Sequence, residues 1–112
     1  MKSWILSIPQ VITLIAMDAQ IVNAIENRQL LRFTYDGGER VVEVHCYGRT
    51  SKGNDAIHAY QVRGYSSTGR MGWKLFTLAE ASSMQLLEET FDGPRPDYKT
   101  GDKAMISIYA EM

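Results

Sequence analysis

The chain has 112 residues, which is enough for one domain with a single core but not for two. Its 45% hydrophobic and 22% charged residues are ordinary for a globular protein. The net charge is −1, so no bulk positive charge points to nucleic acid. The single cysteine, Cys46, excludes an internal disulfide framework and a cysteine-based zinc site, and it favours a reducing compartment such as the cytoplasm.

Charge is nevertheless distributed unevenly along the chain. Residues 28–74 contain eight basic and four acidic side chains, whereas residues 75–112 contain three basic and seven acidic ones. The basic part would suit an anion-binding face. The alternative is that the two kinds of charge interdigitate on the folded surface.

Residues 1–17 form an apolar leader, which Pro9 interrupts. They match a short signal peptide only in part, because no small-residue cleavage site follows, and a packed or disordered leader is the preferred interpretation. No stretch approaches the ~20 apolar residues of a membrane-spanning helix. No membrane contact is therefore expected.

A short helix is predicted next, from about residue 18 to residue 28. Asp18 suits an N-cap, and apolar residues follow it at helical spacing. The pattern then changes to alternation, which predicts a strand over residues 30–35. Asp36-Gly37-Gly38-Glu39 predicts a hairpin, because glycine tolerates the positive φ of such turns.

The return strand over residues 40–47 alternates as well. We expect its apolar side to carry Val42, Val44 and Cys46. Its opposite side would carry Val41, Glu43, His45 and Tyr47. Residues 48–55 contain two glycines and two basic side chains, and they are predicted to form a polar loop.

The strand predicted over residues 56–65 is the central one, and it carries polar groups on both faces. One face would present His58, Tyr60 and Val62. The other would present Ala59, Gln61, Arg63 and Tyr65. The polar ends must be satisfied within the fold or presented to a ligand, because burying them without partners is costly.

The remaining chain continues the pattern of short strands. A turn at residues 66–70 leads to strands at 72–78 and 84–90, with a short connector between them. Two prolines exclude regular structure over residues 91–98, and residues 104–110 form a last strand. One short helix before five or six strands predicts a small mainly-β barrel, in which closure removes exposed sheet edges.

Catalytic and cofactor motifs are lacking in the sequence. His45 and Cys46 are neighbours, but neighbours on a strand point to opposite faces. Two histidines without a convincing carboxylate make a weak metal site. We therefore predict no enzyme activity, no cofactor and no metal. A buried carboxylate beside His45 or His58 would instead favour a small hydrolase or isomerase.

The remaining chemistry is that of recognition, and five side chains form the predicted ligand-binding site: Tyr60, Arg63, Tyr65, Trp73 and Lys74. The guanidinium of Arg63 presents a planar fork that suits phosphate or carboxylate. The aromatic rings, expected near it, would stack on a base. The alternatives are an ion pair of Arg63 with Glu43 or Glu80 and a simple core position for Trp73.

Several stretches carry a family resemblance. They are Ala24-Ile25-Glu26-Asn27-Arg28, Leu31-Arg32-Phe33-Thr34-Tyr35, His58-Ala59-Tyr60-Gln61-Val62-Arg63-Gly64-Tyr65 and Lys74-Leu75-Phe76-Thr77-Leu78. In this order they resemble the WYL domain. The resemblance implies a Sm-like, SH3-type β-barrel over residues 18–91. Residues 92–112 lie beyond it, and we expect them to form a loop and strand packed on the same domain. The name-giving Trp-Tyr-Leu reads Ala59-Tyr60-Gln61 here.

The resemblance also implies a function. It indicates a non-enzymatic bacterial module, linked to transcriptional regulation or defence, that senses a nucleotide or short single-stranded nucleic acid in the cytoplasm. The alternative is a protein-interaction or assembly module, such as a homodimer, that uses the last strand for strand addition. A pocket collecting Tyr60, Arg63 and Lys74 would favour the first, and a two-fold interface over them the second.

Overall fold

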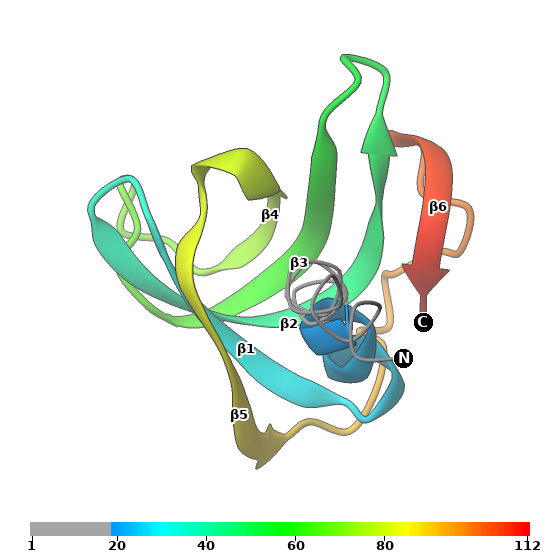
Figure 1. The fold of residues 1–112 in the computed structure, drawn as a ribbon. Coiled ribbons are helices and arrows are strands. Elements are labelled where there is room, and N and C mark those ends of the chain that lie inside the picture. Colours follow the sequence, from blue (N-terminus) through cyan, green and yellow to red (C-terminus); the bar gives the residue numbers. More distant parts are fainter. Residues whose placement is uncertain (1–18) are drawn as a thin grey trace, which may run out of the picture.

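The structure, a computed structural model, describes residues 19–112, and the predicted leader lies outside this range. A helix over residues 19–26 precedes a sheet of antiparallel strands (Figure 1). The strands are β1 (Gln29–Tyr35), β2 (Gly38–Thr50), β3 (Asp55–Gly64), β4 (Gly72–Thr77), β5 (Ser82–Thr90) and β6 (Met105–Glu111). A 3₁₀ turn, η1 (Leu78–Glu80), joins β4 to β5. The predicted fold class, a small mainly-β barrel behind one short helix, is confirmed.

The sheet has the order β4-β3-β2-β1-β5, and β6 pairs with β2 outside this path. β2 is long enough to have two partners along one edge. Residues 38–42 pair with β1, and residues 46–50 pair with β6. Its other edge pairs with β3 over most of its length. The sheet curls around its own core, so that its outer strands β4 and β5 are joined by η1 alone (Figure 1).

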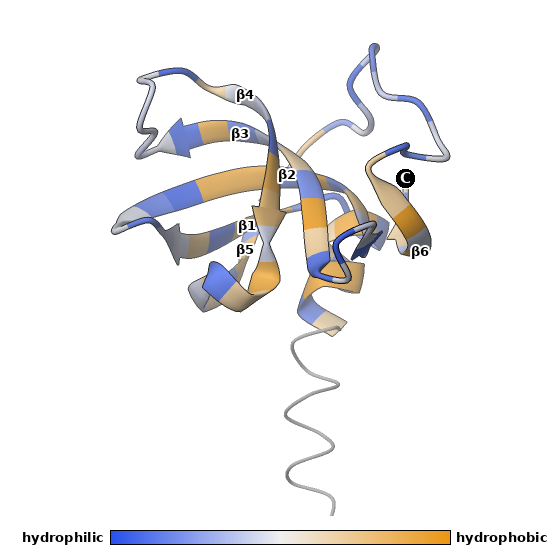
Figure 2. Cartoon of the chain, turned by 90° about the horizontal axis from the view of Figure 1, so that it is seen from above, coloured by the Kyte–Doolittle hydropathy of each residue, from blue (hydrophilic) through white to orange (hydrophobic). Residues whose placement is uncertain are grey.

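The main core fills the inside of this curled sheet, and Figure 2 shows hydrophobic strand centres beside largely hydrophilic hairpin tips. The helix closes one end, just before the start of β1. Its side chains Ile21, Ala24 and Ile25 are at most 5% exposed and belong to the main core. Within residues 19–112, no helix is long and apolar enough to cross a membrane.

A bulge in β2 changes which side chains face the core. The predicted alternation is correct as far as Val44 and wrong beyond it, because His45 is an extra residue between the pairs that Val44 and Cys46 form with β3. Tyr47 therefore joins the main core. Cys46 instead lies in a second cluster with Met105 of β6.

A second irregularity reverses the prediction for Arg63. Gln61 pairs with Val42 and Arg63 pairs with Val41, so Val62 is an extra residue in β3. Directly paired residues present their side chains on the same face of a sheet. Arg63 therefore does not share the inward face of Gln61, which is fully buried, and it is exposed.

The polar loop predicted at residues 48–55 is wrong in length, because β2 continues to Thr50 and β3 begins at Asp55. Gly48 lies within β2 and faces β6. A Cβ at this position would collide with the carbonyl oxygen of Ser107. This glycine permits the close approach of β6 rather than marking a loop.

Gly64 should be needed where β3 ends against the β1–β2 hairpin. Its φ is +99°, and a Cβ there would collide with the carbonyl oxygen of Glu39. That oxygen also accepts a hydrogen bond from the Tyr65 N–H at 2.7 Å. We expect Gly64→Ala to lower the free energy of unfolding by about 1–3 kcal/mol, measured by urea denaturation.

Gly69→Ala is the matched control for this substitution. Gly69 also has a positive φ, +73°, but nothing lies within 4 Å of the added Cβ. Both variants carry backbone strain, and only Gly64→Ala adds the collision. Equal losses of stability in the two variants would contradict the predicted role of this contact.

Candidate ligand-binding site

A cavity of about 440 Å³ lies at the mouth of the barrel, between the β1–β2 hairpin and the β3–β4 turn. We call it the barrel-mouth cavity. Its charged lining side chains are Asp36, Arg40, Arg70 and Lys74. Hydroxyl groups of Ser67 and Thr68 and the aromatic residues Tyr35, Trp73 and Phe76 also line it. Three cations face one carboxylate, which makes the lining positive.

Arg40 is the deepest of these cations. It pairs with Phe33 of β1, which places both side chains inside the barrel, and it is only 4% exposed. Its Nη1 donates to Gln61 Oε1 at 3.3 Å, whereas its buried Nε has no hydrogen-bond partner among the described residues. A buried guanidinium with an unused donor is costly, unless another group satisfies it.

Aromatic rings provide most of the surroundings of this guanidinium. Arg40 Cζ lies 5.6, 5.2 and 5.7 Å from the ring centroids of Tyr35, Tyr65 and Phe76. Such cation–π contacts offset part of the cost of burial. Tyr65 reaches Arg40 across the hairpin, where Gly38 leaves room for the ring, because a Cβ at Gly38 would collide with it.

Lys74 brings a second cation to the same face of the sheet. It pairs with the buried Ala59, and its Nζ donates to Ser66 Oγ at 2.8 Å. Burial lowers the pKa of Lys74, and the positive charge of Arg40 lowers it further. Within residues 19–112, neither Lys74 nor Arg40 forms an ion pair with a carboxylate.

Arg63 lies outside this cavity and has a different partner from those considered. Its Nη1 and Nη2 donate to the two carboxylate oxygens of Glu89 at 3.0 and 2.5 Å. This hydrogen bonding lowers the pKa of Glu89. Glu43 instead binds Arg95, and Glu80 accepts from the Tyr35 hydroxyl at 3.2 Å.

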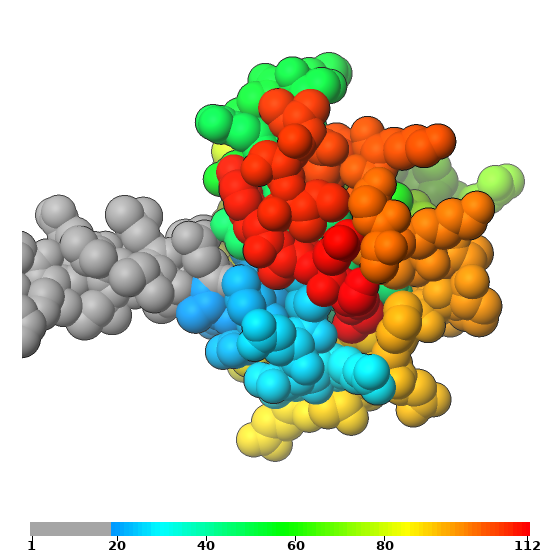
Figure 3. Space-filling view, turned by 90° about the vertical axis from the view of Figure 1, so that its right-hand side faces the viewer, coloured from blue at the N-terminus to red at the C-terminus, as the bar shows by residue number. Residues whose placement is uncertain are grey.

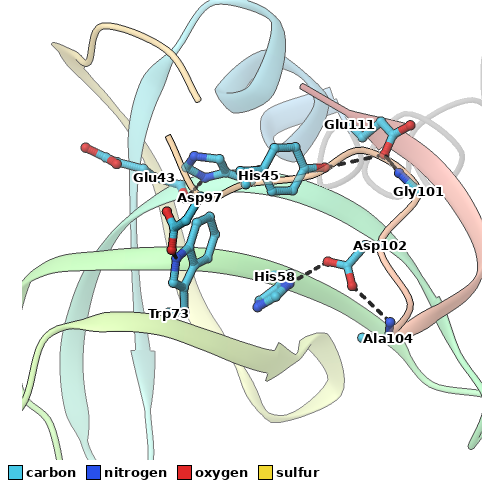
Figure 4. A network of polar contacts seen from close by, with 10 residues as sticks. Glu43, His45, His58, Trp73, Asp97, Gly101, Asp102, Ala104 and Glu111 are labelled. Carbon is cyan, nitrogen blue, oxygen red and sulfur yellow. Dashed lines mark hydrogen bonds and ion pairs between the residues drawn. The ribbon is translucent and has the colours of Figure 1, made fainter. Parts of the chain in front are cut away.

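Tyr60 and Trp73 lie on the opposite face of the sheet, beneath residues 91–104, which we call the C-terminal segment. Figure 3 shows the C-terminal residues, in orange and red, covering this side of the molecule. Arg95 Cζ lies 3.8 Å from the Tyr60 ring centroid. Trp73 Nε1 donates to Asp97 at 2.7 Å (Figure 4). The Trp73 ring also stacks on Tyr98.

The five predicted site residues are therefore in three different surroundings. Lys74 and Tyr65 gather around Arg40 at the barrel mouth. Tyr60 and the ring of Trp73 are covered by the C-terminal segment, and Arg63 is paired with Glu89. The predicted single centre of Tyr60, Arg63 and Lys74 is not formed.

Arg40 is the site residue that sequence reasoning missed, although a signal was present. In the strand predicted over residues 30–35, alternation puts Leu31, Phe33 and Tyr35 on one face. The two-glycine hairpin sets Tyr35 opposite Gly38 and Phe33 opposite Arg40. Carrying this register one step further would have placed Arg40 inside the barrel.

A second cavity, of about 500 Å³, lies under the C-terminal segment and is lined by His58, Trp73 and residues 97–103. Here His58 Nδ1 lies 2.5 Å from Asp102, whose side chain is 8% exposed (Figure 4). The other Asp102 oxygen accepts from the Ala104 N–H at 2.9 Å. This is a buried carboxylate beside a histidine, which was the condition named above for a hydrolase or isomerase.

The arrangement also has a structural explanation. Asp102 joins β3, through His58, to the turn that begins β6, through Ala104. The His58 ring packs against Trp73, with centroids 5.1 Å apart. Within residues 19–112, no group of three or more histidine, cysteine or acidic side chains is arranged to hold a metal ion.

His45 fixes the other end of the C-terminal segment to β2. Its Nε2 accepts the Arg95 N–H at 3.1 Å, so its Nδ1 carries the proton and donates to the Glu43 carbonyl at 2.9 Å. Arg95 Nε and Nη2 donate to the Glu43 carboxylate at 2.8 and 3.1 Å. His45, the bulge residue, and Glu43 together hold Arg95.

Comparisons with protein-family models, curated proteins and solved structures give no match to this chain. The class that the structure defines is thus a small mainly-β barrel with a positively charged mouth. The resemblance to the WYL domain stays a prediction.

Mild acid should destabilise the fold through His45. Burial lowers the pKa of His45 below its ordinary 6.5, so the unfolded chain takes up a proton more readily than the folded chain. Stability should be full above about pH 6.5 and should fall as the pH drops below it. Urea midpoints at about pH 7.5 and about pH 5.5 would measure this effect.

His45→Gln should remove much of this pH dependence, even if it lowers stability at both pH values. His58 is present in both proteins, and most carboxylates titrate at lower pH. The difference between the two proteins therefore isolates His45. An identical pH dependence in wild type and variant would show that His45 is not the responsible group.

Proposed function

We propose that the protein is a binding module for a nucleotide or short single-stranded nucleic acid, whose phosphate enters the barrel-mouth cavity. The observation that carries the proposal is Arg40, a buried guanidinium with an unused donor and no carboxylate partner among the described residues. An anion would satisfy this donor by entering the cavity as far as the Arg40 guanidinium, whose Nε is buried. Arginine suits phosphate because its planar fork matches two oxygens.

The second cation supports an anionic ligand over a neutral one. Lys74 and Arg40 are close enough for Arg40 to lower the pKa of Lys74. Their mutual repulsion is unfavourable, and the attraction of both cations to a bound anion would offset it. Arg70, an exposed residue on the rim of the same cavity, adds positive charge at the entrance.

Aromatic side chains at the mouth support a ligand with a base. Tyr65 is 48% exposed while it contacts Arg40, so one side of the ring remains open. Tyr35 lines the cavity from β1, whereas the ring of Trp73 stacks on Tyr98 on the opposite face of the sheet. Stacking on such rings is tolerant of base identity, as a sequence-independent binder requires. A link to bacterial transcriptional regulation or defence follows from the WYL resemblance alone.

We assign the His58–Asp102 pair a structural role and therefore propose a binding module rather than an enzyme. Both oxygens of Asp102 are engaged, and they connect two parts of the chain.

The second candidate function is assembly through β6. β6 pairs with β2 on one edge, and Ile106 on this strand is 68% exposed. An open edge with an exposed apolar side chain suits strand addition.

A salt titration of single-stranded DNA and RNA binding tests the proposed function. Binding should weaken steeply with salt, because phosphate contacts release counterions. Lys74→Gln should weaken binding to every sequence and reduce the slope of log K against log salt by about 1. Fluorescence anisotropy with labelled twelve-nucleotide strands would measure both effects.

Arg63→Ala and Lys52→Gln are the comparison variants. Arg63 is held by Glu89, and Lys52 lies exposed in the β2–β3 turn. Both should bind like wild type. Loss of binding in Arg63→Ala with no change in Lys74→Gln would move the site away from the barrel mouth. No binding by the folded wild type at low salt would favour the assembly function.

A further inference from the structure

Resting on the proposed function, we infer that the barrel-mouth cavity takes a terminal phosphate monoester, the end of a nucleic acid strand or a mononucleotide, rather than the phosphodiester within a strand. Charge, depth and the closed floor of the cavity each support this choice.

The charge of the lining matches a dianion. Arg40, Arg70 and Lys74 oppose a single carboxylate, Asp36, so the lining carries a net charge of +2. A phosphate monoester carries about −1.5 to −2 at pH 7. A phosphodiester carries one negative charge, which leaves one unit of the positive charge of the lining uncompensated. An uncompensated charge is expensive next to a buried group such as Arg40.

The depth of Arg40 restricts what can reach it. The residue is 4% exposed, and the rings of Tyr35, Tyr65 and Phe76 surround its guanidinium. The narrow end of a strand can enter such a site with a single phosphate. An internal phosphodiester would need to bring both flanking nucleotides into the same mouth.

The floor of the cavity is closed. Behind Arg40, the rings of Phe33 and Phe76 pack edge to face with centroids 4.9 Å apart, and both are at most 2% exposed. A strand cannot pass through this core and leave on the other side. The cavity is therefore a dead end, which suits the end of a chain.

Hydrogen-bond donors at the mouth are sufficient for a group with three terminal oxygens. Arg40 Nε is unused, and Lys74 Nζ spends one of its three donors on Ser66. Ser67 and Thr68 line the same space with hydroxyl groups. A monoester offers one more terminal oxygen to these donors than a diester does.

The test compares one labelled twelve-nucleotide DNA strand in three forms, with a phosphate at the 5′ end, at the 3′ end or at neither. We expect one phosphorylated form to bind about tenfold or more tightly than the unphosphorylated strand, since charged hydrogen bonds are at stake. Capping that phosphate as a methyl diester should abolish most of the gain. Adenosine monophosphate and adenosine serve as competitors.

Two variants locate the effect. Lys74→Gln should remove the preference for the phosphorylated strand, and the control Lys52→Gln should keep it. Arg40→Lys retains the charge but loses the fork, and it should reduce the preference too. Thermal unfolding followed by circular dichroism verifies that each variant folds. If Arg40→Lys does not fold, Lys74→Gln alone decides the outcome.

The outcomes separate this inference from the proposed function. Equal affinity for all three strands, with binding still sensitive to salt and to Lys74→Gln, would overturn the inference and leave the proposed function standing. No binding of any strand or nucleotide would overturn both. Competition by adenosine monophosphate but not adenosine identifies a free nucleotide as sufficient. If adenosine monophosphate does not compete although a phosphorylated strand binds tightly, the ligand is the phosphorylated end of a strand.

Discussion

The bulge at His45 is the constraint on which the two faces of this protein depend. It adds one residue to β2, so the alternation of side chains between the two faces is reversed after it. Tyr47 turns into the barrel core, and Glu43 and His45 are left on the other face. There Glu43 binds the side chain of Arg95, and His45 accepts the backbone N–H of Arg95. One extra residue thus completes the core and docks the C-terminal segment.

The barrel mouth is organised by a charge that the fold itself does not neutralise. A hydrophobic residue at position 40 would pack against Phe33 without cost, whereas Arg40 brings a guanidinium into the same space. Three rings and the Gln61 side-chain oxygen reduce the penalty, but none carries a negative charge. Functional sites commonly retain groups that are suboptimal for stability, because the ligand completes them. The proposed anion would complete the buried arginine in this way.

Much of the fold was predictable from the sequence because its signals are local. Alternating side chains and glycine-rich turns placed every strand of the described region to within a few residues. The bulges were not predictable, because a bulge is defined by the register of a partner strand. The unpredicted register also led to errors in the predicted binding site. Arg63 was assigned to the wrong face through the bulge at Val62, and Arg40 was missed although the hairpin register places it inside.

The uneven charge distribution along the sequence left two alternatives, an anion-binding face or interdigitated charges. Interdigitated charges occur in the fold, and the proposed anion site would use the cations that they leave out. Glu89 neutralises Arg63, and Arg95 neutralises Glu43, so acidic and basic residues from the two parts of the chain do interdigitate. The cations of the barrel mouth are left out of these pairs within residues 19–112. Glu89, Asp97 and Asp102 of the C-terminal part have partners away from the barrel mouth, so they leave the positive charge of this cavity uncompensated. A protein with a net charge of only −1 can therefore still concentrate positive charge at one cavity, as the proposed anion site requires.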